Sequence, residues 1–335
     1  MKRIASFFLA LALAFSLTAC TVPVEKADDG KIQIVATLFP YYDFARAIVG
    51  DRADVTLLLS PGREAHSFEP TPLDAVTISE SDVFLYNGGE GEYWVDSMLG
   101  AAGENIAVIA RMMDYVDALD EEYVEGMQGA DGHDHDHEHG SHDDHDHDHE
   151  EDEHDSDEIE YDEHIWTSPK NAVVLCRAVC DAICRADAEN AAFYRANCEN
   201  YCAQLEDLDA RFAALCESAP RRLLIFADRF PMLYFCREYG LDYRAAFHGC
   251  SGDTEPSLAT IKFLIDKVED ENIPVVYTID FGTKKVAAVV SECTGAAIET
   301  LYSMQTVSRA DFDAGETYLT LMERNFEALR KGLNA

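Results

Sequence analysis

Short apolar segments with the alternation of β-strands recur along the chain, and segments with helical periodicity separate them. In the first half, strand patterns lie at 31–37, 54–59, 83–86 and 106–110, and helical patterns at 41–49, 71–79 and 93–99. In the second half, strand patterns lie at 222–226, 242–247, 275–279 and 296–301, and helical patterns at 233–239, 257–269, 284–292 and 317–333. Strands that alternate with helices are typical of parallel sheets. We therefore predict an α/β fold with two lobes, each a parallel sheet flanked by helices.

Two helical patterns lie between these halves. Residues 169–186 form the first, and residues 188–218 form a second that is long enough to reach about 45 Å. We expect the longer helix to cross between the lobes. The predicted domains are an N-terminal lobe at 31–187, a linking helix at 188–219 and a C-terminal lobe at 220–335.

The charge of the chain is concentrated in one segment. The 335 residues carry a formal net charge of −38, and residues 131–164 hold 18 acidic side chains, no Lys or Arg, and 10 of the 12 histidines. This acidity argues against nucleic-acid binding, which needs a basic surface. Low complexity and the absence of periodicity predict a disordered insert from 117 to 163 within the N-terminal lobe.

Imidazoles alternate with carboxylates inside this insert. Imidazole binds Zn, Cu and Ni well, and the carboxylates add a negative field that concentrates cations. A disordered segment loses entropy when it orders around an ion, so we expect several sites of moderate affinity. The predicted accessory ligands are His133, His135, His137, His139, His142, His145, His147, His149 and His154.

The amino terminus has the pattern of an export signal. A basic pair precedes an apolar run at 4–19, which is too short for a comfortable membrane span, and Cys20 follows directly. The sequence resembles a bacterial lipoprotein signal, in which this cysteine is lipidated; the alternative is an ordinary secretory signal with a chance cysteine. We predict a signal peptide at 1–19, lipidation at Cys20 and a polar tether at 20–30.

Nine cysteines remain after Cys20, and an odd number cannot pair completely within one chain. Cys176, Cys180 and Cys184 lie at four-residue spacing on one helix face. Free cysteine behaves there as a small hydrophobic residue, so the spacing favours helix packing over a cysteine metal site. One or two disulfides remain an open alternative in an exported protein.

Three segments outside the insert carry candidate metal ligands. His66 lies in the loop after the second strand, His164 lies just ahead of a helix, and Asp280 directly follows the third strand of the second half. The carboxyl ends of parallel strands are where α/β folds place ligands. The sequence therefore predicts a metal site in the cleft between the lobes.

Several motifs resemble those of the metal-binding lipoproteins of zinc and manganese ABC importers, the cluster A-I solute-binding proteins, and specifically their zinc-uptake type. The motifs are PGREAHSFEPTP at 61–72, DEHIWTSPKNA at 162–172, CREYGL at 236–241, TEPS at 254–257 and TYLTLMERN at 317–325. The resemblance runs from residue 32 to residue 333. It implies two α/β lobes joined by one long helix, with the metal held between them. The acidic histidine-rich insert resembles the loop typical of the zinc members.

The resemblance also implies four metal ligands. His66 matches the first, His164 the second and Asp280 the fourth.

The third ligand departs from the family pattern. Ungapped counting places Arg229 there, and a guanidinium cannot bind a metal because it stays protonated. One residue of slippage gives Asp228, our first choice. His248 is the alternative, and water or a histidine of the insert is a further one.

Two histidines with two aspartates would hold manganese as well as zinc. The histidine-rich insert and the Irving–Williams order favour zinc, so we predict Zn²⁺ as the ligand, with Mn²⁺ as the runner-up. The predicted protein is monomeric, extracytoplasmic and anchored to the cell membrane by lipid. It captures Zn²⁺ for an ABC permease and its ATPase and is not an enzyme.

Two other functions remain open. A zinc hydrolase would use an open coordination position to activate water, although no H-E-x-x-H motif occurs. A metal buffer or adhesin would act without a transporter.

Overall fold

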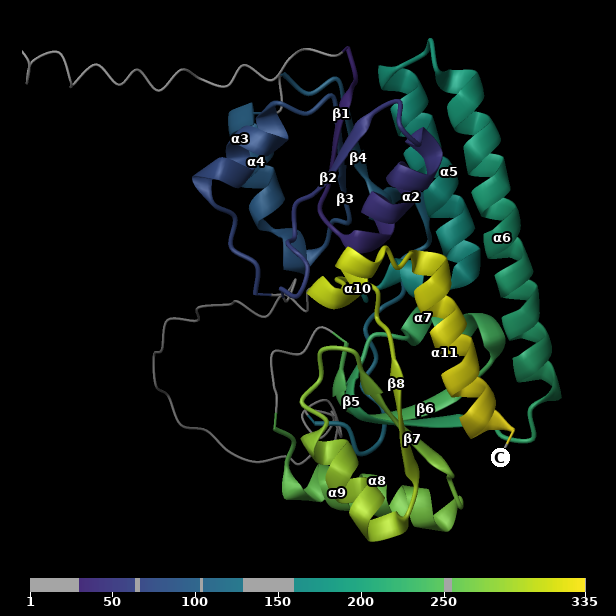
Figure 1. Cartoon of the computed structure of the whole chain (residues 1–335). Coiled ribbons are helices and arrows are strands. Elements are labelled where there is room, and N and C mark those ends of the chain that lie inside the picture. The colour runs from purple at the N-terminus through teal and green to yellow at the C-terminus, as the bar shows by residue number, and fades with distance from the viewer. Residues whose placement is uncertain (1–29, 64–66, 103–104, 129–159, 250–254, 335) are drawn as a thin grey trace, which may run out of the picture. The chain divides into compact units, whose positions relative to one another are not determined.

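Two four-stranded parallel sheets form the framework of the structure (Figure 1). The computed structural model describes residues 30–63, 67–102, 105–128, 160–249 and 255–334. The first sheet has the order β2-β1-β3-β4, with β1 (Gln33–Ala36), β2 (Asp54–Leu57), β3 (Val83–Tyr86) and β4 (Val108–Arg111). The second has the order β6-β5-β7-β8, with β5 (Leu223–Phe230), β6 (Asp242–His248), β7 (Val275–Ile279) and β8 (Ala297–Leu301). The predicted α/β class with two parallel sheets is confirmed.

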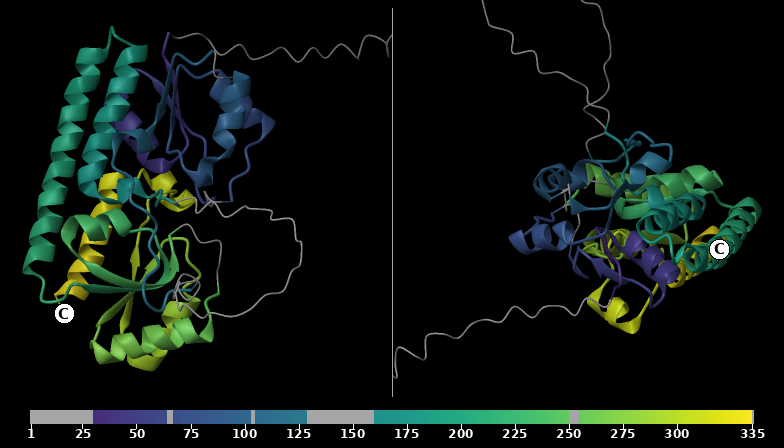
Figure 2. Two further views of the ribbon diagram at one scale, coloured as in Figure 1. Left: turned by 180° about the vertical axis from the view of Figure 1, so that it is seen from behind. Right: turned by 90° about the horizontal axis from the view of Figure 1, so that it is seen from above.

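Helices cover both faces of each sheet (Figures 1 and 2). On the first sheet, α2 (Phe39–Val49) and α5 (Pro169–Ala186) contact one face, while α3 (Pro72–Ser79) and α4 (Trp94–Ala102) lie on the other side. On the second sheet, α8 (Leu258–Asp270) and α9 (Lys285–Thr294) contact strands on one face, and α11 (Tyr318–Leu333) contacts β7 and β8. No helix within the described ranges is both long and apolar enough to cross a membrane.

One long helix, α6 (Ala191–Ser218), contacts helices of both lobes. Its 28 residues span about 42 Å. It packs against α5 and α2 beside the first sheet, and against α11 and α7 (Leu233–Tyr239) beside the second. One long helix joining the lobes is therefore confirmed, and it begins at Ala191, three residues after the predicted start.

The two lobes share one hydrophobic core. A single cluster of buried residues contains Ile34 and Phe84 of the first sheet together with Phe226 and Tyr277 of the second. A smaller cluster lies between the second sheet and the helices α8 and α9. Because the larger cluster is continuous, separating the lobes would expose apolar surface to water, which is unfavourable.

Two elements differ from the sequence prediction. Strand β5 extends to Phe230, four residues beyond the predicted end, since its polar second half hides the apolar pattern. The helix α10 (Arg309–Ala314) was not predicted, because it is six residues long and buries none of them. Ser308 begins it by accepting a hydrogen bond from the backbone N–H of Asp311.

The edges of the predicted disordered insert have a defined conformation. Residues 117–128 and 160–163 approach each other through an antiparallel bridge between Asp120 and Tyr161. The backbone N–H of Glu121 donates to Glu160 O at 2.8 Å. Apolar side chains spaced through this acidic stretch, including the buried Met127, pack onto the core and explain the difference. The boundary of the insert at 117 is corrected accordingly, and residues 129–159 lie outside the described part of the chain.

Cysteine packing agrees with the prediction. Eight cysteines fall in the described ranges and all are free; seven are buried and Cys293 is exposed.

A buried carboxylate ties three helices together and gives a testable prediction. Asp43 of α2 is 2% exposed, and its Oδ2 accepts hydrogen bonds from Tyr201 Oη of α6 at 2.7 Å and from the backbone N–H of Tyr318 of α11 at 2.9 Å. Asp43→Ala would leave two buried donors without this acceptor, so we expect the free energy of unfolding to fall by about 3 kcal/mol in urea titration. Asp51→Ala, at an exposed site just after α2, is the matched control; equal effects would contradict the role.

Candidate metal centre

His164 is a buried imidazole whose orientation is fixed by a carboxylate. His164 is 1% exposed and immediately precedes the 3₁₀ turn η5 (Ile165–Thr167). Asp162 Oδ1 lies 3.1 Å from His164 Nδ1 and accepts the backbone N–H of His164 at 2.7 Å. This contact assigns the proton of the neutral ring to Nδ1, which leaves the lone pair on Nε2 for a metal.

The same surroundings alter the proton affinity of this ring. Burial lowers the pKa of His164, but the charge and hydrogen bond of Asp162 and the charges of Glu163 and Glu121 outweigh it, so the pKa is raised. Because a metal binds only the neutral ring, protons compete with it from a higher pH than at an unperturbed histidine.

Both lobes hold the segment that carries His164. Asn87, after β3, donates through Nδ2 to Glu163 O at 3.0 Å, and Tyr234 of α7 donates to Asp162 O at 2.8 Å. Glu163 Oε1 accepts the backbone N–H of Gly91 at 2.7 Å. A Cβ at Gly89 would lie 2.5 Å from the same carboxylate oxygen, so glycine is required there.

Trp166 packs against His164 and links its segment to both lobes. It is fully buried, and its Nε1 donates to Ser303 O of the second lobe at 2.8 Å. Its ring stands edge-on to Tyr41 at 6.2 Å and contacts His164 at 5.6 Å between centroids.

A small cavity opens beside His164. Its volume is about 20 Å³, which suits one water molecule or one bare ion. The lining residues come from the carboxyl ends of β5 and β7 and from the loops that face them: His164, Arg229, Pro231, Gly249, Ile279, Phe281, Ser303, Gln305 and Thr306. The imidazole therefore faces the edge of the second sheet where its strand order reverses, between β5 and β7, which is where open α/β sheets bind ligands.

Asp228 lies at a bulge of β5, next to a residue that lines this cavity. Phe226 pairs with Ala245 and Arg229 with Phe247, so β5 has one residue more than β6 over this stretch. Asp228 Oδ1 accepts the backbone N–H of Arg229 at 2.9 Å. A Cβ at Gly282 would lie 1.7 Å from Asp228 Oδ2, so the carboxylate rests directly against the loop after β7.

Asp280 begins that same loop, between the cavity-lining Ile279 and Phe281. Its Oδ1 accepts the backbone N–H of Ser303 at 3.0 Å. Asp228 and Asp280 thus lie at the strand ends that supply lining residues to the cavity beside His164, but neither lines it, and Asp280 lines a neighbouring cavity instead. Among the described residues, these three side chains do not bring their ligand atoms within 4.8 Å of one another.

The alternative ligand His248 has a different environment. Its Nδ1 lies 2.9 Å from Glu121 Oε1, and its ring is 5.1 Å from that of Tyr123. His248 does not line the cavity, but the next residue, Gly249, does. A Cβ at Gly249 would lie 3.1 Å from the ring of His164. Glu121 was missed by the sequence analysis, because nothing distinguishes it from its acidic neighbours before the fold places it here.

His66, Cys20 and the insert histidines 133–154 lie outside the described residues. Their predicted roles therefore rest on the sequence.

A larger cavity of about 410 Å³ lies beside Gly88 and Gly89. It contains the carboxylates of Glu90, Glu92 and Asp96 but no imidazole. The smaller cavity differs from it in having a histidine that is oriented by a carboxylate, an arrangement typical of metal ligands.

The contact between Asp162 and His164 predicts that one substitution lowers both the zinc affinity and the pKa of His164. Asp162→Asn should weaken zinc binding at pH 8 by about 10- to 100-fold, since it replaces the carboxylate that accepts from Nδ1 with a neutral and weaker acceptor. It should also lower the pKa of His164, so the loss of zinc on acidification should begin at a lower pH. Competition titrations between pH 5 and 8 measure both quantities.

Asp114→Asn, on an exposed turn, should change neither. An unchanged acid profile in Asp162→Asn would contradict the proposed link between Asp162 and His164.

Comparison with known proteins agrees with this geometry. The family described as "Zinc-uptake complex component A periplasmic" (ZnuA) matches residues 34–332. The high-affinity zinc uptake system protein ZnuA of Bacillus subtilis is 30% identical over 336 residues, covering 99% of this chain and 98% of that protein. The zinc-binding lipoprotein AdcA of Streptococcus pneumoniae is 30% identical, and the match covers 99% of this chain but 61% of AdcA.

Solved structures share the fold. The metal-dependent lipoprotein YcdH of B. subtilis superposes with a TM-score of 0.72 at 29% identity, covering 90% of this chain and 100% of that one. The Zn(II)-bound ZnuA-like domain of S. pneumoniae AdcA gives a TM-score of 0.71 at 24% identity over 91% of this chain and 100% of that domain. The resemblance drawn from the sequence motifs is confirmed, and the chain belongs to the ZnuA family of zinc-uptake proteins.

Proposed function

We propose that this protein captures Zn²⁺ outside the cytoplasm and delivers it to an ABC permease. The observation that carries the proposal is the buried His164, oriented by Asp162 and facing the strand ends that bear Asp228 and Asp280. The names of the relatives, a zinc uptake protein and a zinc-binding lipoprotein, support zinc as the ligand.

The proposed ligands are His66, His164, Asp228 and Asp280. The imidazole of His164 lines the cavity, Asp228 and Asp280 are chain neighbours of its lining residues Arg229, Ile279 and Phe281, and with His66 they would make a four-coordinate set. His248 is less suited to this role, because its imidazole is already paired with Glu121. The oxygen-rich set would tolerate Mn²⁺, but Zn²⁺ binds more tightly to most N/O sites.

Partners and location follow from the family and the N-terminal sequence. Cys20 would carry the lipid, and the remaining chain would present bound zinc to the permease and its ATPase. The proposed role is capture rather than catalysis, as in the zinc uptake relatives.

The histidine-rich insert would act as a collector. Its imidazoles and carboxylates would bind several ions with moderate affinity and pass them to the buried site. The insert is continuous in sequence with residues 160–163, which immediately precede His164.

A competition titration tests the proposal. Zinc and manganese would be titrated into soluble protein that lacks residues 1–20 and 131–154, in the presence of a chromophoric chelator. We expect one tight zinc site that excess manganese does not displace. Preference for manganese would overturn the zinc assignment, and the absence of any tight site would overturn the buried centre.

The same protein with the insert retained is the control. It should bind several more zinc ions, all weaker than the first. If removing 131–154 abolished the tight site as well, the insert would be the main site and not a collector.

A further inference from the structure

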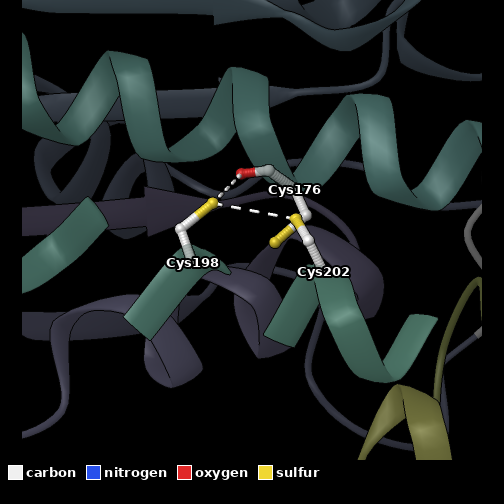
Figure 3. Close-up of side chains that lie close together, drawn as sticks. All are labelled: Cys176, Cys198 and Cys202. Carbon is white, nitrogen blue, oxygen red and sulfur yellow. Dashed lines mark hydrogen bonds between the residues drawn. The ribbon is translucent and has the colours of Figure 1, made fainter. Parts of the chain in front are cut away.

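A second cluster of side chains that could bind a metal differs in chemistry from the His164 site, because all its donor atoms are sulfur. Cys176 of α5 faces Cys198 and Cys202 of α6, and the three thiols converge between the two helices (Figure 3). Their Sγ atoms all lie within 4.8 Å of one another, and all three residues are buried.

The spacing fits a common metal ion. Cys198 Sγ and Cys202 Sγ are 3.9 Å apart. The other two Sγ pairs lie within 4.8 Å, so an ion between the three sulfurs would be about 2.3–2.8 Å from each, close to a metal–thiolate bond length of about 2.3 Å. The i, i+4 spacing in α6 presents both thiols on one face, and the antiparallel α5 supplies the third from across the seam.

The present contacts of these thiols are weak. Cys198 Sγ lies 3.8 Å from Cys176 O, and Cys202 Sγ lies 3.9 Å from Val173 O. Both carbonyls belong to the middle of a helix and have backbone partners there. A metal ion would therefore replace weak S–H···O contacts, and no strong hydrogen bond would be lost.

Binding of a metal ion by the three thiols would release their protons to solvent, because thiolates are the metal ligands.

We propose that Cys176, Cys198 and Cys202 form a three-thiolate site for a soft metal ion, with Cu(I) as the best match. Soft thiolates select Cu(I), whereas zinc in a closed site takes four ligands. This site differs in chemistry from the nitrogen and oxygen centre at His164, so a soft ion such as Cu(I) would favour the thiolates. An ion here would also cross-link α5 to α6.

The test is a Cu(I) titration of the reduced mature chain under anaerobic conditions. The protein is first saturated with zinc, which occupies the His164 centre and the insert, and Cu(I) is then added with a competing chromophoric chelator. We expect one equivalent of Cu(I) to be held against the chelator, with a thiolate-to-copper charge-transfer band in the near ultraviolet. Histidine and carboxylate ligands do not give this band.

Matched variants separate the site from general effects. Cys198→Ala should weaken Cu(I) binding at least about 100-fold and remove most of the band, because it deletes one of three ligands. Cys216→Ala changes a buried cysteine of the same helix outside the cluster and should leave both unchanged. Should Cys198→Ala fail to fold, as judged by circular dichroism, Cys176→Ala on the other helix decides. No retained Cu(I), or equal binding in cluster and control variants, would overturn the proposal.

Discussion

His164→Ala is expected to weaken zinc binding at the tight site by more than about 100-fold. The change removes a ligand, so the loss should exceed the 10- to 100-fold cost of losing an outer partner such as Asp162. The residue is 1% exposed and lines the cavity together with Arg229 and Ile279, so no solvent-exposed group replaces it readily. The affinity would be measured by chelator competition at pH 8 on protein lacking residues 131–154.

His248→Ala is the matched control. Its imidazole pairs with Glu121 and does not line the cavity, so we expect zinc affinity to change by less than about tenfold. A loss in His248→Ala as large as that in His164→Ala would make His248 the third ligand in place of Asp228. Full zinc affinity in His164→Ala would refute the assignment of the centre.

Trp166→Ala is expected to lower the free energy of unfolding by about 3–5 kcal/mol, the usual cost of removing a large buried aromatic side chain. Trp166 joins the lobes: its ring packs on Tyr41 of the first, and its Nε1 donates to Ser303 O of the second. Urea titration followed by circular dichroism would measure the loss.

Trp166→Phe separates packing from hydrogen bonding. It keeps an aromatic ring but loses the donor to Ser303 O, so part of the loss, at least about 1 kcal/mol, should remain. Because the indole also contacts the ring of His164, zinc affinity should fall further in the alanine variant than in the phenylalanine variant. If Trp166→Ala lowered the free energy of unfolding by less than about 1 kcal/mol, Trp166 would not join the lobes as described.

Local sequence signals predicted most of the fold. The helix at 169–186 was predicted with its observed bounds, since Pro169 occupies its first position and its apolar face is regular. Strand β7 was also predicted with its observed bounds. A strand that is buried along its whole length has a continuous, mainly apolar sequence, here VVYTI. The second half of β5 was not, since its bulge interrupts the alternation on which strand prediction depends.

Part of the candidate site could also be predicted from local sequence signals. Asp280 and His164 stand beside recognisable elements, so their position could be inferred from strand and helix patterns. The contacts of Glu121 and the meeting of Cys176 with Cys198 depend on which elements pack together, and spacing along one element carries no such information.

The core shared by the two sheets has a thermodynamic consequence. A chain whose lobes bury one continuous apolar cluster should melt in a single calorimetric transition, although it contains two complete sheets. The conformational entropy of bringing the lobes together is then lost during folding and not during ion capture. Zinc would meet a preorganised receptor, and its binding would raise the melting temperature of the whole molecule, not of one half.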